Sequence, residues 1–186
     1  MPLETRVRMR NTGLVILSLV LSILVAEFFV RIFVTVRDVG PSFTTYDPYF
    51  GKRLKRSFNA ERITPEFRMR LATNSFGFRG PEPTRFPSDP VLFLGDSFTM
   101  GYGVSDGSEF PSRIDAELRR RHGASAPTVV NAGIGDSGNG FWVKFLRLNA
   151  KTINPRLVVM QVLDNDFVDN VSEGLFALKA DGSLDE

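Results

Sequence analysis

The stretch VLFLGDSFTMGYGV, residues 91–104, decides how the rest of the chain is organised. Four apolar residues, Val91 to Leu94, stop at Gly95, and Asp96 and Ser97 follow directly. A short apolar run that ends at a glycine predicts a buried strand followed by a tight turn. The residues after Ser97 resemble the start of a helix, where backbone N–H groups have no intrahelical partner. The pattern therefore makes Ser97 a candidate nucleophile.

Two other interpretations of this turn stay open. Serine and aspartate in front of a helix are ordinary N-cap residues. Gly101 and Gly103 suggest a phosphate-binding loop, but the G-x-G-x-x-G spacing and a following Gly-Lys-Ser/Thr are absent. The nucleotide-binding interpretation is therefore the weaker one.

Composition excludes several classes of protein. The 186 residues are 42% hydrophobic and 24% charged, which fits a globular domain with an appendage. Cysteine is absent, so disulfides and thiolate metal sites are excluded. Residues 1–70 carry 12 basic against 6 acidic residues, whereas residues 71–186 carry 11 against 15. A nucleic-acid partner is not expected, because the basic excess lies outside the expected domain.

An apolar segment near the N-terminus predicts a membrane anchor. Residues 1–12 form a basic tail, and residues 13–36 are long enough, at about 1.5 Å per residue, to cross a hydrocarbon core of roughly 30 Å. Glu27 and Arg31 are four residues apart and can pair near the lipid surface. A cleaved signal peptide is the alternative, but no small-x-small site follows. Basic residues flank the segment on both sides, so their count does not decide the topology.

Residues 37–70 are predicted to be a linker, because prolines, glycines, aromatic and basic residues follow one another there without a sustained period. The basic patch at residues 52–56 is expected to face solvent or lipid headgroups. Residues 63–73 predict a strand at the domain edge. The sequence NSFGFRGPEP, residues 74–83, predicts a loop.

From Pro90 onward, predicted strands alternate with predicted helices. One helix carries the stripe Phe110, Ile114 and Leu118 between a Ser108 cap and a Gly123 stop, and a second carries the stripe Phe141, Phe145 and Leu148. Strands are predicted at residues 128–130 and 157–163, the latter buried on both faces, and a hairpin at residues 176–184. This order predicts an α/β fold with a parallel sheet and right-handed crossovers.

Polar or glycine-rich clusters follow each predicted strand, at residues 95–97, 131–136 and 164–166. Ligands bind beyond the carboxyl ends of parallel strands, so these clusters are expected to meet at one edge. A hydroxyl, backbone N–H groups and an asparagine amide are the parts of an acyl-transfer site. Asp164, Asp166 and Asp169 lack the spacing of a calcium loop and are interpreted as capping carboxylates. No metal or cofactor is predicted.

Three blocks of sequence, GDSFTMGYGV, VVNAGIGDSG and VVMQVLDNDF, resemble the first three blocks of the SGNH (GDSL-type) hydrolases. These are serine hydrolases that act on esters and acetyl groups. The motif TNSFGFRG and the anchor resemble a membrane-anchored subset with an extracytoplasmic domain. The resemblance covers about residues 71–170, and it implies a three-layer, flavodoxin-like sheet with about three core strands in a partial domain at residues 71–186.

The resemblance also implies roles for single residues. Ser97 matches the nucleophile, whose own N–H contributes to the oxyanion hole, and the side-chain amide of Asn165 matches a second donor. The family places its second-block glycine at the position of Asp136, whereas this chain has its glycine at Gly135. The third donor is then the N–H of Gly135 or of Asp136, with Gly135 favoured.

The general base is where the chain departs from the family pattern. The family takes a histidine, with an aspartate three residues earlier, from a later block that nothing here matches. The one histidine, His122, lies at the far end of the first predicted helix, roughly 18 Å from the Ser97 edge. The chain is therefore expected to be the N-terminal part of a longer hydrolase.

The expected function is that of a membrane-anchored serine esterase or deacetylase, acting on small ester or O-acetyl groups of carbohydrate or lipid. Its expected location is the bacterial inner membrane, with lipid around the helix and the domain on the extracytoplasmic side. Two alternatives remain. One is an O-acetyltransferase of cell-envelope polysaccharide, and the other is a tethered binding protein that is catalytically dead because the histidine block is absent.

Overall fold

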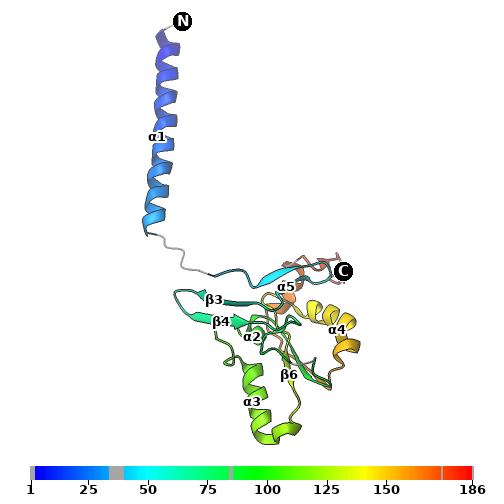
Figure 1. The fold of residues 1–186 in the computed structure, drawn as a ribbon. Coiled ribbons are helices and arrows are strands. Elements are labelled where there is room, and N and C mark those ends of the chain that lie inside the picture. Colours follow the sequence, from blue (N-terminus) through cyan, green and yellow to red (C-terminus); the bar gives the residue numbers. More distant parts are fainter. Residues whose placement is uncertain (1–2, 34–39, 84–85, 173, 186) are drawn as a thin grey trace. The chain divides into compact units, whose positions relative to one another are not determined.

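The computed structural model describes residues 3–33, 40–83, 86–172 and 174–185 (Figure 1). The chain divides into two compact units, Met1–Arg37 and Asp38–Glu186. The first consists of one helix, and the second is a mixed α/β domain that contains all the candidate site residues.

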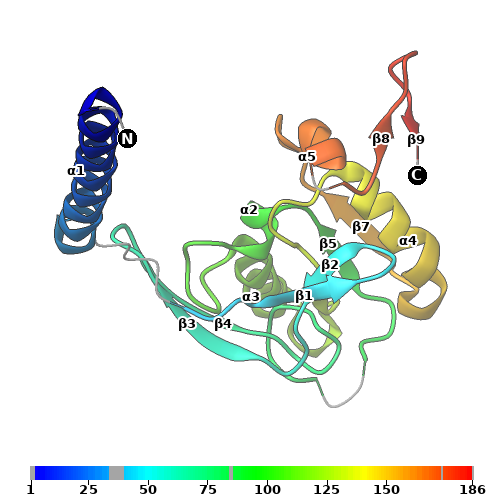
Figure 2. The same ribbon diagram turned by 90° about the horizontal axis from the view of Figure 1, so that it is seen from above.

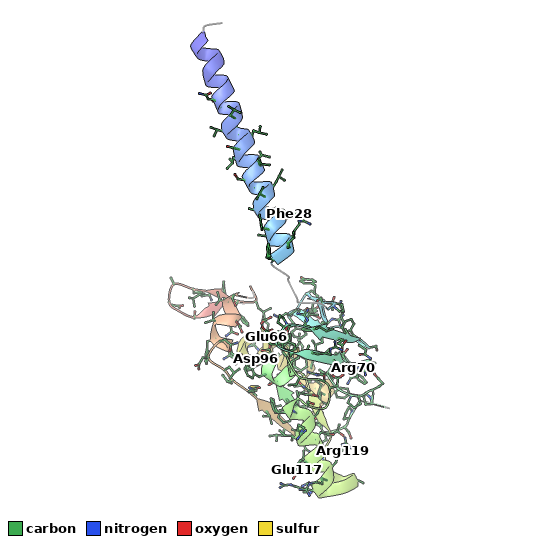
Figure 3. The ribbon with its side chains drawn as sticks, turned by 90° about the vertical axis from the view of Figure 1, so that its left-hand side faces the viewer. Phe28, Glu66, Arg70, Asp96, Glu117 and Arg119 are labelled. Atoms are coloured by element: carbon green, nitrogen blue, oxygen red, sulfur yellow. The ribbon has the colours of Figure 1, made fainter. Side chains whose placement is uncertain are left out.

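Helix α1, Leu3–Phe33, forms the first unit. Its segment Asn11–Phe33 has a mean hydropathy of 2.6 over its most apolar window, and its apolar side chains project outward along the helix (Figure 3). By length and composition this helix is able to span a membrane, as predicted for residues 13–36, of which 34–36 lie outside the described residues. Arg31 Nε donates to Glu27 Oε1 at 2.8 Å, which confirms the predicted pair.

A three-stranded parallel sheet lies at the centre of the second unit. Its strands are β5 (Val91–Leu94), β6 (Val129–Asn131) and β7 (Leu157–Met160), in the order β6-β5-β7. All four residues of β5 are buried, because the strand has a neighbour on each side. Helix α3 (Phe110–His122), followed by the short 3-10 helix η1 (Gly123–Ser125), leads from β5 to β6, and α4 (Asn139–Ile153) leads from β6 to β7. The predicted α/β fold with a parallel sheet is confirmed.

Strand β7 differs from its prediction. It ends at Met160 rather than at residue 163, and Leu157 and Met160 are 53% and 43% exposed. The expectation of a strand buried on both faces was therefore wrong. In the described part of the chain β7 is an edge strand that pairs only with β5, so its apolar residues have no second neighbour to cover them.

The segment predicted to be a linker, residues 37–70, contributes regular structure to the domain in its described part, residues 40–70. Strands β1 (Thr44–Asp47) and β2 (Gly51–Leu54) form one antiparallel hairpin, and β3 (Asn59–Ile63) and β4 (Arg68–Ala72) form another (Figure 2). Leu54, Met69 and Leu71 are at most 2% exposed and belong to the core. In β4, Met69 and Leu71 alternate with the exposed Arg68 and Arg70, which is the period of a half-buried strand.

Helix α4 supplies the largest side chain of the core. Trp142 is fully buried between Phe141 and Phe145, whereas Leu148 of the predicted stripe is 55% exposed. The indole N–H of Trp142 donates to Ser137 Oγ at 3.0 Å, so its polar atom is satisfied. Truncating such a side chain to alanine costs about 3–5 kcal/mol.

Helix α3 and the C-terminal hairpin agree in part with prediction, and helix α5 was not predicted. Helix α3 ends at Gly123 as predicted, although its N-cap is Glu109 rather than Ser108 and Ile114 is 37% exposed. The chain continues through α5 (Asp166–Ser172) into a short hairpin of β8 (Ala177–Leu178) and β9 (Leu184–Asp185). This hairpin corresponds to the one predicted at residues 176–184.

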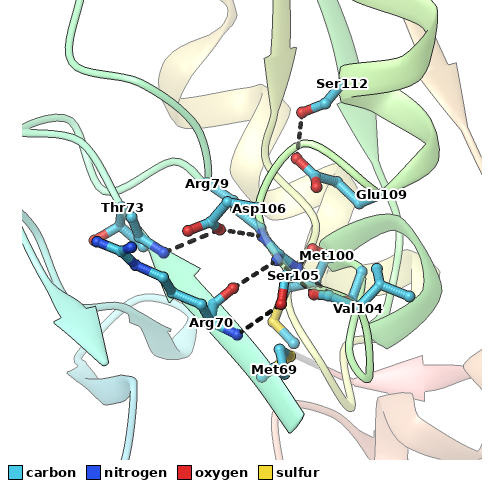
Figure 4. A network of polar contacts seen from close by, with 12 residues as sticks. Met69, Arg70, Thr73, Arg79, Met100, Val104, Ser105, Asp106, Glu109 and Ser112 are labelled. Atoms are coloured by element: carbon cyan, nitrogen blue, oxygen red, sulfur yellow. Dashed lines mark hydrogen bonds and ion pairs between the residues drawn. The ribbon is translucent and has the colours of Figure 1, made fainter. Parts of the chain in front are cut away.

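Arg79, from the predicted loop, is the centre of a buried polar network (Figure 4). Its guanidinium is fully buried and donates five hydrogen bonds of 2.6 to 3.2 Å. The acceptors are the Asp106 carboxylate and the backbone carbonyls of Arg70, Met100, Gly101 and Val104. Arg79 thus ties strand β4 to the short helix α2 (Ser97–Met100) and to the loop that follows it.

Replacing Arg79 by methionine is expected to lower the free energy of unfolding by about 3 kcal/mol or more, because the buried carbonyls lose their donors. Arg156→Met is the matched control, since Arg156 donates to the Asp89 carboxylate at 2.6 Å in an exposed pair. The control is expected to cost less than about 1 kcal/mol. Denaturant unfolding of the full chain in neutral detergent, followed by Trp142 fluorescence, measures both; equal losses would contradict the central role of Arg79.

Candidate active site

Ser97 is the first residue of α2, directly beyond the carboxyl end of the central strand β5. The N-cap is Asp96, whose Oδ1 accepts from Phe98 N at 2.9 Å. The residue that caps the helix is therefore Asp96, which is buried. The hydroxyl of Ser97, a partly buried residue, is not needed as the cap. The N–H of Ser97 is among those that have no acceptor within the helix.

Gly95 is needed for close packing rather than for an unusual backbone angle. Its φ is not among the positive values of this chain, so the tight turn does not depend on the left-handed region. A Cβ at Gly95 would lie 2.7 Å from Thr99 Cβ and still closer to Thr99 Oγ1. That hydroxyl donates to Gln161 Oε1 at 2.6 Å, which links α2 to the segment that follows β7.

The loop after β6 packs directly against α2. Ile134 N donates to Gly95 O at 3.0 Å, and a Cβ at Gly133 would lie 2.7 Å from the Thr99 carbonyl carbon and closer to Met100 N. Only glycine permits this approach without moving the backbone. A Cβ at Gly135 would lie 3.7 Å from Ser97 Cβ, so Gly135 lies beside Ser97 at ordinary contact distance.

A cavity of about 520 Å³ opens beside Ser97. Gly135 and Asp136 line it from the loop after β6. The hairpin strands and the segments beside them supply most of the other wall residues, so the supposed linker contributes to the candidate site. The remaining lining residues are Ser42, Phe43, Thr44, Lys52, Arg62, Met100 and Tyr102.

Asp136 occupies the position at which the resemblance places a glycine. Its φ is +55°, a left-handed conformation that glycine adopts readily and aspartate less often. The backbone at this position therefore has the geometry that a glycine would take. Both candidate donors, the N–H groups of Gly135 and Asp136, belong to residues that line the cavity with Ser97.

Asn165 is placed differently from the other two predicted site residues. Its side chain is exposed, its Nδ2 donates to Asp169 Oδ2 at 2.9 Å, and its carbonyl accepts from Val168 N at the start of α5. Asn165 does not line the cavity beside Ser97. The structure thus brings Ser97 and Gly135 together and leaves the Asn165 amide bound to a carboxylate.

The acidic residues near Asn165 act as hydrogen-bond acceptors at the start of α5. Asp166 is buried, and its Oδ2 accepts from Leu163 N at 2.6 Å. Burial raises the pKa of Asp166, the Leu163 N–H opposes that rise, and the charges of Asp96 and Asp169 add to it. Among the described residues, no group of three or more His, Cys, Asp or Glu side chains is placed to hold a metal ion.

His122 lies at the end of α3, exposed, and does not line the Ser97 cavity. Figure 3 labels Glu117 and Arg119, in the last two turns of α3, well away from Asp96, which directly precedes Ser97. The interpretation of His122 as a helix-terminal residue rather than a base agrees with this placement.

Sequence reasoning missed three contributors to the site. Arg79 stabilises the carboxyl end of α2, and Lys52 and Arg62 reach the cavity from β2 and β3. No sequence signal marked Arg79 as buried, because arginine is mostly exposed and is almost never fully buried unless it is paired. No signal marked Lys52 or Arg62 either, since their role depends on how the hairpins pack.

Comparison of the chain with protein-family models found no match, and comparison with curated proteins found none either. The site is therefore interpreted from its own geometry, which is that of a hydroxyl beside backbone N–H groups on the wall of a cavity.

Proposed function

We propose that this chain is a membrane-anchored serine hydrolase of the SGNH type that acts on ester or O-acetyl groups. The observation that carries the proposal is that Ser97 and Gly135 line one cavity at the carboxyl edge of the sheet, so close together that a Cβ added to Gly135 would lie 3.7 Å from Ser97 Cβ. The strand order β6-β5-β7, with α3 and α4 as crossover helices, supports the three-layer arrangement that the resemblance implies.

In the proposed mechanism, Ser97 Oγ attacks the carbonyl carbon of the ester. The Oγ–C bond forms, the carbonyl oxygen becomes an oxyanion, and the N–H groups of Ser97 and Gly135 stabilise its charge. The ester C–O bond then breaks, and the alcohol leaves with the proton that Ser97 Oγ gave up to the base. In a second step the oxygen of a water molecule bonds to the acyl carbon, the Ser97 Oγ–C bond breaks, Ser97 Oγ regains a proton from that water through the base, and the acid is released.

The proposal assigns the nucleophile and the backbone donors but gives no role to His122, which lies away from the cavity. A serine hydroxyl is a poor nucleophile until a base takes its proton. The test therefore supplies a base, because added imidazole can accept this proton if Ser97 and the donors are already in position. Asn165 joins the donor set only if its amide leaves Asp169.

Ser97→Ala tests the nucleophile. The full chain in neutral detergent is expected to hydrolyse para-nitrophenyl acetate at least about tenfold faster than Ser97→Ala in the same imidazole buffer, because only the serine can form an acyl-enzyme. Release of nitrophenolate gives the rate, and the variant corrects for hydrolysis by imidazole itself. Ser108→Ala, at an exposed serine outside the cavity, is the control and is expected to keep the wild-type rate. Equal rates for the wild type and Ser97→Ala would exclude Ser97 from the chemistry.

Gly135→Ala tests the space beside the nucleophile. The added methyl group meets only ordinary contacts, so the free energy of unfolding is expected to change by less than about 1 kcal/mol. The imidazole-dependent rate is expected to fall about 10- to 100-fold, because the methyl group lies where the substrate carbonyl must approach its donors. Gly133→Ala is the contrasting variant and is expected to lose about 2 kcal/mol or more of stability, because its Cβ meets the backbone of α2. If Gly135→Ala keeps the wild-type rate, the acyl group of the substrate does not bind beside Gly135.

The proposed location is the bacterial inner membrane, with α1 as an uncleaved anchor and the domain on the extracytoplasmic side. The length and composition of α1 support the anchor. Alkaline phosphatase fused to the C-terminus is expected to be active, because that enzyme needs an oxidising compartment to form its disulfides. A fusion that is made in normal amounts but is inactive would show that the domain lies on the cytoplasmic side instead.

A further inference from the structure

The cavity beside Ser97 has a basic wall. Lys52 of β2 and Arg62 of β3 line it, and Asp136 is the acidic side chain among its lining residues. Residues 44–62, to which the lining residues Thr44, Lys52 and Arg62 belong, carry five basic and two acidic side chains. Lys52 belongs to the patch at residues 52–56 that was predicted to face solvent or lipid headgroups, but the structure places it, together with Arg62, on the wall of the cavity that Ser97 also lines.

Lys52 reaches the cavity on the same side as the candidate oxyanion donors. Its side chain is only 20% exposed, and its Nζ lies 3.7 Å from Asp136 Oδ2. The Asp136 side chain is 78% exposed, and its ion pair with Lys52 holds the ammonium group beside residues 135–136. An anionic group that enters the cavity at this point would meet the charge of Lys52 next to the candidate donors.

Arg62 is held in place by aromatic rings. Its guanidinium carbon lies 5.2 Å from the ring centre of Phe43 and 6.0 Å from that of Tyr102, and its Nη1 lies 3.3 Å from the Tyr102 hydroxyl. Both aromatic residues also line the cavity. A guanidinium fixed in this way loses little conformational freedom when it binds a carboxylate or phosphate through two parallel hydrogen bonds.

We propose that the ligand of this cavity carries a carboxylate or phosphate group next to its ester, bound by Lys52 and Arg62. As a statement about the substrate, this inference rests on the proposed function, because it names the class of ester that Ser97 would attack. That class is anionic esters, such as an acetylated acidic sugar or an ester of a phosphorylated alcohol. The charge preference itself concerns binding and does not require turnover.

The test compares matched ligands on the full-length Ser97→Ala protein in neutral detergent at low salt. The probes are para-acetoxybenzoate, para-acetoxyphenyl phosphate and the neutral para-acetoxybenzamide, which share one acetyl ester and one ring. At least one anionic probe is expected to bind about fivefold or more tighter than the amide, and the preference is expected to shrink at about 0.5 M salt. The stronger anion shows whether carboxylate or phosphate is the natural group.

Lys52→Gln and Arg62→Gln, each added to Ser97→Ala, are expected to reduce the preference for the anionic probe about threefold or more, while leaving the affinity for the amide nearly unchanged. Arg56→Gln is the matched control, because Arg56 is an exposed cation of the same segment that does not line the cavity. Trp142 fluorescence confirms that each variant is folded. Equal affinities for the anionic and neutral probes, or an equal effect of Arg56→Gln, would overturn the inference.

The two proposals fail separately. If the anionic probes bind more tightly but no Ser97-dependent hydrolysis is measured, the cavity binds anions and the esterase proposal is wrong. Ser97-dependent hydrolysis of neutral and anionic acetates at equal kcat/KM, together with equal affinities, would keep the esterase and remove the anionic substrate.

Discussion

The close approach of two backbone segments at the carboxyl edge of the sheet holds the candidate site together. The loop after β6 lies so near to α2 that Gly133 has no room for a Cβ against Met100, and Ile134 N donates to Gly95 O in the same region. Protein interiors are packed too densely to absorb an added methyl group without displacement. The position of Ser97 relative to Gly135 therefore depends on glycines that take no part in chemistry.

A buried arginine supplies the second constraint. Helix α2 has only four residues, which is too short to be stable through its own hydrogen bonds. Arg79 supplies donors to the carbonyl groups at the carboxyl end of α2, because its guanidinium binds the carbonyls of Met100 and Gly101. These carbonyls are therefore not left unpaired. The guanidinium charge is in turn balanced by Asp106. A loop residue remote from the nucleophile in sequence thus stabilises the turn that presents it.

The two hairpins give the basic segment that precedes the sheet a different role from the one predicted. Charges that appear to belong to a membrane-proximal linker form part of the domain, and two of them face the cavity that contains Ser97. Asn165 is the opposite case: its side-chain amide was expected at the site, but it binds Asp169 at the start of α5 instead. The residues that line the cavity thus come from the hairpins and the segments beside them as well as from the loops beyond the strands.

The sequence by itself determined the features that are local. The apolar run before Gly95 predicted the buried strand β5, the order of apolar segments predicted the parallel α/β arrangement, and the length of the N-terminal segment predicted a helix able to span a membrane. Ser97 was found in the same way, because a hydroxyl directly after a strand and before a helix is visible in the printed order of residues.

Only the tertiary structure decided which residues are neighbours across long sequence separations. The short strands β1 to β4 have mixed composition, and their few apolar residues become recognisable as core only when Leu54 and Met69 pack against the sheet. The exposure of β7 depends on an absent neighbour along its edge in the described residues, and the environments of Lys52 and Arg79 depend on residues brought to them by folding. Burial and pairing are properties of the packed assembly, so a pattern along one segment does not contain them.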